Sequence, residues 1–102
     1  SEKKAMGWFL DGQVTALVGT HTHVPTADAV ILPRGTGYIT DIGMTGPVHS
    51  ILGRRVDRVL TKFRTGMPSK FDVADGACRM GTVLLEIVQG KTVGIKQEEF
   101  TG

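Results

Sequence analysis

The stretch Val14-Thr-Ala-Leu-Val-Gly-Thr-His-Thr-His23 decides how this chain is interpreted. Its first half, Val14–Val18, is a short and mostly apolar run that ends at Gly19, a pattern typical of a buried strand. Two of the chain's three histidines, His21 and His23, follow at once. In extended backbone, residues two apart point to the same side, so both imidazoles are expected to converge on one point. We therefore predict a site just beyond this strand, where open α/β sheets bind their ligands.

Neutral imidazole is the commonest nitrogen ligand of transition metals, so the His-x-His spacing favours a metal site. The alternative is that two histidines meet by chance on a solvated loop, because this spacing alone is a weak signal. Two ligands are also fewer than the three of a typical catalytic zinc site. Thr20 and Thr22 are expected to orient the ligands through hydrogen bonds. We interpret His49 as a surface histidine and Asp28 as a loop-capping residue, whereas Asp41 is either a hydrogen-bond anchor or a site residue.

Outward from this stretch, the pattern changes between helix and strand. Apolar residues recur at helical spacing up to Leu10 and again over Leu52–Arg64. Thr20–Gly37 is expected to be a loop, and Gly43–Pro47 a turn. Further strands are predicted over Tyr38–Ile42, Phe71–Val73, Met80–Val88 and Val93–Ile95, with a hairpin turn at Gln89-Gly90-Lys91. This order predicts an α/β or α+β layered domain with an antiparallel edge.

Composition excludes several classes of protein. The chain has 102 residues, of which 40% are hydrophobic and 22% charged, so a disordered or fibrous protein is not indicated. No apolar run is long enough for a transmembrane helix, and we expect no membrane partner. A single cysteine, Cys78, excludes an internal disulfide framework and favours a reducing compartment, so a cytoplasmic protein is expected. A net charge of +2 does not by itself imply a nucleic-acid partner.

The sequence around the two histidines resembles that of a known family. Val18–Asp28, followed by Ile31–Pro47, is similar to the C-terminal part of the YmdB-like metallophosphoesterases. The opening Ser1–Trp8 and the segment Ile51–Gly53 fit the same family. The family belongs to the calcineurin-like superfamily and is described as 2′,3′-cyclic-nucleotide phosphodiesterases. The resemblance covers essentially the whole chain and rests on an ordered run of unusual glycine and proline positions.

This resemblance implies a fold and a site. The fold would be the C-terminal portion of the calcineurin-like α/β sandwich, with two sheets flanked by helices. The site would hold two divalent metal ions (Fe, Mn or Zn), with His23 on the first metal and His21 on the second. The residues that the resemblance makes site-adjacent are Thr20, Thr22, Asp41, Gly43, Met44, Thr45 and Gly46. The other ligands and the general acid belong to Gly-Asp, Gly-Glu-Asn and Gly-Asn-His motifs, and a further ligand histidine is expected upstream of Ser1; this chain contains none of them.

The resemblance therefore implies a metal-dependent phosphodiesterase that acts on cyclic nucleotides or related small phosphodiesters. Residues 1–102 are expected to form one region, the C-terminal part of a domain whose N-terminal part is absent, and to be inactive alone. We also expect self-association, or association with the missing part, through exposed sheet edges. The alternatives are a non-catalytic truncated module and an RNA-binding regulator with a vestigial metal clip. The regulator would use the basic stripe of Arg54, Arg58 and Lys62, which otherwise is a solvated helix face.

Overall fold

The computed structural model describes residues 1–70 and 72–102 of the chain. Within these residues, two compact units can be distinguished. The first comprises Ser1–Met44 with Gly81–Glu99, and the second comprises Thr45–Met80 with Phe100–Gly102. The strands form two three-stranded sheets. No helix among the described residues is long and apolar enough to cross a membrane.

The sheet of the first unit has the order β1-β3-β2. β1 (Ala16–Val18) runs parallel to β3 (Gly37–Ile39), and β2 (Val30–Ile31) pairs with β3 in the antiparallel sense. This sheet thus has an antiparallel edge, but a strand that the sequence did not predict forms it. β3 ends at Ile39, not at Ile42 as predicted, and β2 lies inside the predicted loop because two residues are too few to leave a periodic pattern.

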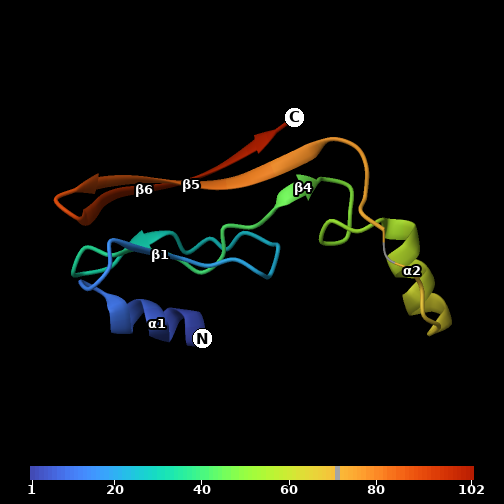
Figure 1. Ribbon diagram of the computed structural model, residues 1–102, viewed down its shortest axis with the longest axis horizontal. Helices are drawn as coiled ribbons and strands as arrows, with labels where there is room; N and C mark the ends of the chain where they lie inside the picture. The colour runs from blue at the N-terminus through green and yellow to red at the C-terminus, as the bar shows by residue number, and fades with distance from the viewer. Residues whose placement is uncertain (71) are drawn as a thin grey trace. The chain divides into compact units, whose positions relative to one another are not determined.

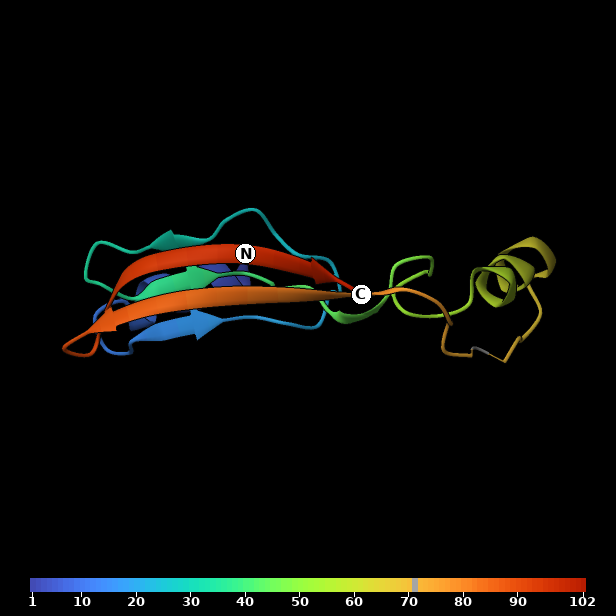
Figure 2. The same cartoon turned by 90° about the horizontal axis from the view of Figure 1, so that it is seen from above.

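Helix α1 (Glu2–Leu10) covers one face of this sheet, and the β5–β6 hairpin runs over the other (Figures 1 and 2). β5 spans Cys78–Val88 and β6 spans Lys91–Thr101, so both strands are longer than predicted. The hairpin turn itself is confirmed, with positive φ at Gln89 and Gly90. Thr92 of β6 fastens the hairpin to the sheet, because its N–H donates to Gly35 O (2.9 Å) and its hydroxyl donates to Thr15 O (2.7 Å).

The core of the first unit is small and partly polar. Ile39 has no exposed surface, and Leu32 and Tyr38 are also buried. Of the strand predicted over Val14–Val18, only Ala16–Val18 forms one, and it is not buried, since 45% of Val18 is exposed. β1 lies at the edge of its sheet, with β3 on one side and no described strand on the other. An edge strand has a neighbouring strand on one side only, so its side chains are less covered, which explains the exposure of Val18.

The second unit contains β4 (Thr45–Pro47) and helix α2 (Val56–Thr65). The turn predicted for Gly43–Pro47 is wrong over its second half, because β4 pairs with the start of β5 in the antiparallel sense. The predicted helix begins too early, since Leu52 and Gly53 have positive φ and cannot extend a right-handed helix. The helix ends as expected at Gly66, whose N–H donates to Lys62 O.

The strand predicted for Phe71–Val73 falls partly outside the described residues, because Phe71 is not described. Of the other two positions, Val73 forms an isolated bridge with Arg54 and neither belongs to a strand. On α2, Val59 is buried, whereas 79% of Phe63 is exposed. The apolar residues that recur at helical spacing in this helix are therefore only partly buried within the second unit.

Candidate functional site

The loop that follows β1 is held against the end of β3 by its first residue. Gly19 N–H donates to Ile39 O (3.0 Å), and Ile42 N–H donates to Gly19 O (2.9 Å). A Cβ atom on residue 19 would lie 1.9 Å from the carbonyl oxygen of Thr40. Only glycine permits this approach of two backbones. The close approach fixes where the loop with the two histidines, residues 19–25, leaves the sheet; we call it the histidine loop.

Both histidines of this loop are exposed and adopt backbone conformations that are rare for L residues. The φ angle is 105° at His21 and 66° at His23. The loop predicted here is found, but it lacks the extended backbone that would turn both imidazoles to one side, because the strand ends at Val18 and the chain then bends. Each such conformation costs about 1–3 kcal/mol and persists only where the surroundings impose it. The geometry of the loop therefore depends on contacts outside it.

Asp41 supplies those contacts from a completely buried position. Its Oδ2 atom accepts hydrogen bonds from the N–H of Thr22 (2.9 Å) and from the hydroxyl of Thr22 (2.7 Å). Its Oδ1 atom accepts one from the N–H of Gly43 (2.8 Å). The ammonium group of Lys3 lies 3.6 Å from Oδ2 and donates to Thr20 O (2.7 Å). Thr22, between the two histidines, is therefore tied to a fixed negative charge.

The electrostatic environment keeps this carboxylate ionised. Burial by itself would raise the pKa of Asp41, since it removes water from the charged form. The hydrogen bond from the Thr22 hydroxyl, those from the N–H groups of Gly43 and Thr22, and the charge of Lys3 together outweigh burial and lower the pKa to about 2. Asp41 is thus a pure hydrogen-bond acceptor near neutral pH. Of the two roles open to it, the structure supports that of the hydrogen-bond anchor.

A second carboxylate, Asp28, fixes the next part of the loop. It accepts hydrogen bonds from the Thr26 hydroxyl (2.6 Å) and from both the N–H and the hydroxyl of Thr40. Burial tends to raise the pKa of Asp28, but the bonds from Thr26 and Thr40 leave it lowered. The hydroxyl of Tyr38 lies 2.8 Å from that of Thr40 and extends the network. The predicted role of Asp28 in fixing the loop is confirmed.

The other residues that the sequence singled out lie elsewhere. Met44 O accepts a hydrogen bond from Gly81 N–H (3.2 Å) in the first unit. Thr45 and Gly46 belong to β4 of the second unit, opposite Met80 and Arg79. His49, also in the second unit, is exposed as expected. The structure thus joins four of the expected site-adjacent residues in one network with the histidine loop: Thr20, Thr22, Asp41 and Gly43.

The chain offers two imidazoles for a metal ion but not a full set of ligands. Among residues 1–70 and 72–102, no three His, Cys, Asp or Glu side chains gather closely enough to hold a metal ion. The nearby carboxylate of Asp41 is already used by Thr22, Gly43 and Lys3. The residues present therefore fit the role of two ligands and do not complete a metal site.

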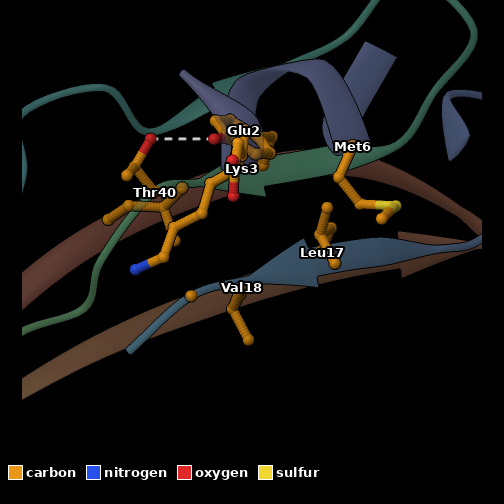
Figure 3. A pocket seen from close by; sticks show the side chains of 9 residues that line it. Glu2, Lys3, Met6, Leu17, Val18 and Thr40 are labelled. Atoms are coloured by element: carbon orange, nitrogen blue, oxygen red, sulfur yellow. Dashed lines mark hydrogen bonds between the residues drawn. The ribbon is translucent and has the colours of Figure 1, made fainter. Parts of the chain in front are cut away.

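An apolar groove of about 260 Å³ lies beside the histidine loop, between α1 and β1 (Figure 3). Met6 of α1 and Leu17 and Val18 of β1 line it, and it reaches Gly19 and Thr40 at the start of the loop. The lining is almost entirely apolar. This composition is typical of a surface that packs against protein and not of a phosphate-binding surface.

The sequence and the fold both match known proteins. Residues 1–97 match the sequence profile of YmdB-like proteins. The chain belongs to the YmdB-like family. It is 48% identical over 100 residues to the 2′,3′-cyclic-nucleotide 2′-phosphodiesterase of Bacillus subtilis, a match that covers 98% of this chain and 38% of the relative. The chain therefore spans less than half the length of that relative.

Two solved structures superpose on this chain. A hypothetical protein from Thermus thermophilus has a TM-score of 0.92 with 46% sequence identity, covering 98% of this chain and 40% of that one. A phosphatase from Mycoplasma pneumoniae has a TM-score of 0.91 with 35% identity, covering 98% of this chain and 37% of that one. The small α/β fold thus matches less than half of each of these two longer chains.

Sequence reasoning missed Lys3 as a member of the site. It lies on α1, seventeen positions before the Thr20 carbonyl to which it donates. No local pattern marks it, because lysine at an early helix position is ordinary. Only the packing of α1 over the sheet brings its ammonium group to Thr20 and Asp41.

Proposed function

We propose that this chain forms part of a metal-dependent phosphodiesterase that acts on cyclic nucleotides or related phosphodiesters. One observation carries the proposal. Two exposed histidines stand on a braced loop at the carboxyl end of β1, in a chain 48% identical to a 2′,3′-cyclic-nucleotide 2′-phosphodiesterase. This is the edge of an α/β sheet at which ligands usually bind.

In this proposal, the chain contributes metal ligands to the active site. His23 would hold the first divalent metal ion and His21 the second, whether these ions are Fe, Mn or Zn. Metal ions in such a pair stabilise the attacking and leaving oxygens of a phosphoryl group. Both imidazoles are exposed, and the Asp41 network keeps the loop that carries them fixed.

The remaining ligands and the general acid would come from outside residues 1–102. In this proposal, the chain is the C-terminal part of a calcineurin-like α/β sandwich. The unpaired edge of β1 and the apolar groove between α1 and β1 are the surfaces on which the rest of the domain packs. Burial of Met6 and Val18, which are 49% and 45% exposed, would favour that association.

The chain alone is therefore expected to hydrolyse neither bis-p-nitrophenyl phosphate nor a 2′,3′-cyclic nucleotide, even with added Mn²⁺. Phosphoryl transfer depends on complete positioning and charge neutralisation, which two ligands do not supply. Turnover by the isolated chain at a rate typical of intact enzymes would overturn this part of the proposal.

A chimaera tests the positive part. The region of the Bacillus subtilis phosphodiesterase that matches this chain is replaced by residues 1–102, and hydrolysis of 2′,3′-cyclic AMP is measured with Mn²⁺. We expect an active chimaera that loses at least 100-fold in kcat/KM on either His21→Ala or His23→Ala. His49→Ala is the matched control, since this exposed histidine lies in the second unit. Full activity of both variants would remove the two histidines from the site.

A further inference from the structure

We propose that Asp41 is a positioning residue, which holds His21 and His23 in their metal-accepting arrangement through Thr22. The inference rests on the proposed metal site and adds a residue that prepares it. Asp41 would touch neither metal nor substrate. It would fix the backbone between the two ligands before a metal ion arrives.

The first support is the position of Thr22 between the two ligands. Both of its donors, the N–H and the hydroxyl, are directed to the same carboxylate oxygen, at 2.9 and 2.7 Å. The hydroxyl also lies 3.4 Å from the N–H of Val24, which donates to it. Two bonds to one oxygen define both where residue 22 lies and how its peptide is turned. The adjoining residues His21 and His23 then have little backbone freedom left.

The second support is that Asp41 itself cannot follow the loop. Its side chain is fully buried, and its Oδ1 atom is held by Gly43. Its backbone is bonded on both sides to Thr26, whose N–H donates to Asp41 O and whose hydroxyl accepts from Asp41 N–H, each at 2.9 Å. Asp41 is therefore a fixed point, and Thr22 is the residue that it holds.

The third support is the conformation of the two histidines. Positive φ at both His21 and His23 is unfavourable for the isolated chain, so the loop would relax to other conformations if nothing held residue 22. A loop already in its bound conformation loses less entropy when a ligand binds. Groups that orient metal ligands in this way typically change metal affinity by about 10–100-fold when mutated.

The test compares Thr22→Val with Thr22→Ser in the full chain. Valine keeps the size of threonine but lacks the hydroxyl, whereas serine keeps the hydroxyl that donates to Asp41. Asp41→Asn removes the charge that both Thr22 bonds use. Asp57→Asn is the matched control, because it changes a carboxylate on α2 of the second unit that is paired with Arg55.

Two readouts are measured on each folded variant. The first is the conformation of the loop, from the backbone couplings of His21 and His23 and the exchange rate of the Thr22 amide by NMR. The second is the affinity for Zn²⁺, by competition with a chelator. We expect Thr22→Val and Asp41→Asn to change the couplings, to speed exchange and to weaken Zn²⁺ binding about 10-fold or more, while Thr22→Ser and Asp57→Asn stay within about 2-fold.

The two readouts separate this inference from the proposed function. If the wild-type chain and the His21→Ala variant bind Zn²⁺ equally, the proposed metal site fails, and the couplings alone then decide the role of Asp41 in the loop. If Thr22→Val keeps both the wild-type couplings and the wild-type Zn²⁺ affinity, the inference itself is overturned. A change in thermal stability alone, with both readouts unchanged, also overturns it, because that result indicates a structural role only.

Discussion

The hydroxyl of Thr22 lies 2.7 Å from Oδ2 of Asp41, a carboxylate that has no exposed surface. The two residues are nineteen positions apart, and their contact joins the loop after β1 to the segment after β3. The parallel pairing of β1 with β3 makes this possible, because it brings the carboxyl ends of both strands to the same edge. The histidine loop is thus anchored by the segment that directly follows the neighbouring strand, β3.

Acid is expected to destabilise the first unit through Asp41. Its pKa is about 2 in the folded chain and 3.8 in the unfolded chain, so the unfolded state binds the proton more tightly. The stabilisation is fully present above pH 4 and is lost as the pH falls toward 2. Its size is on the order of 2 kcal/mol. Urea unfolding between pH 2 and pH 6 measures it, and Asp41→Asn should flatten the acid limb of that curve.

Gly19→Ala is expected to destabilise the first unit by about 3 kcal/mol or more, since the new Cβ would lie 1.9 Å from Thr40 O. The carbonyl belongs to the backbone and cannot rotate away. Gly102→Ala is the control, because nothing lies within 4 Å of a Cβ there. Chemical denaturation compares the two. Equal stability of both variants would show that the approach of Gly19 to Thr40 is not rigid.

Ile39→Ala and Phe63→Ala should differ strongly in their effects. Ile39 is completely buried in the first unit, so its truncation is expected to cost about 2–5 kcal/mol. Phe63, on α2, is 79% exposed, and its truncation should change stability by less than about 0.5 kcal/mol. Thermal or urea unfolding of the two variants provides the comparison. A large loss for Phe63→Ala would mean that the face of α2 is covered in solution.

Lys3→Ala should have a small effect that depends on salt. The Lys3 side chain is 40% exposed and lies 3.6 Å from Asp41, so the ion pair is partly screened and is worth less than about 1 kcal/mol. Its effect on stability should shrink between 50 mM and 500 mM NaCl. Lys4→Ala, one position along the same helix, is the control. A loss independent of salt would assign the effect to the bond with Thr20 O instead.

Local patterns in the sequence predicted much of the first unit. Three elements depend on consecutive residues only, and all three are found: the helix up to Leu10, a strand in the apolar run before Gly19, and the hairpin turn at Gln89-Gly90. The two-residue strand β2 was missed because it is too short to carry a period, and β4 because its pairing with β5 depends on residues more than thirty positions away. Sequence also named Thr22 and Asp41, but it did not connect them.

By itself, the sequence determined the family and the choice of His21 and His23, because both depend on residue identity and order. The tertiary structure decided how those histidines are held. The backbone has positive φ at both positions, and a buried charge reaches Thr22 from the segment after β3. Such contacts leave no pattern in consecutive residues, because hydrogen bonds between residues far apart in the sequence form only when the sheet brings them together.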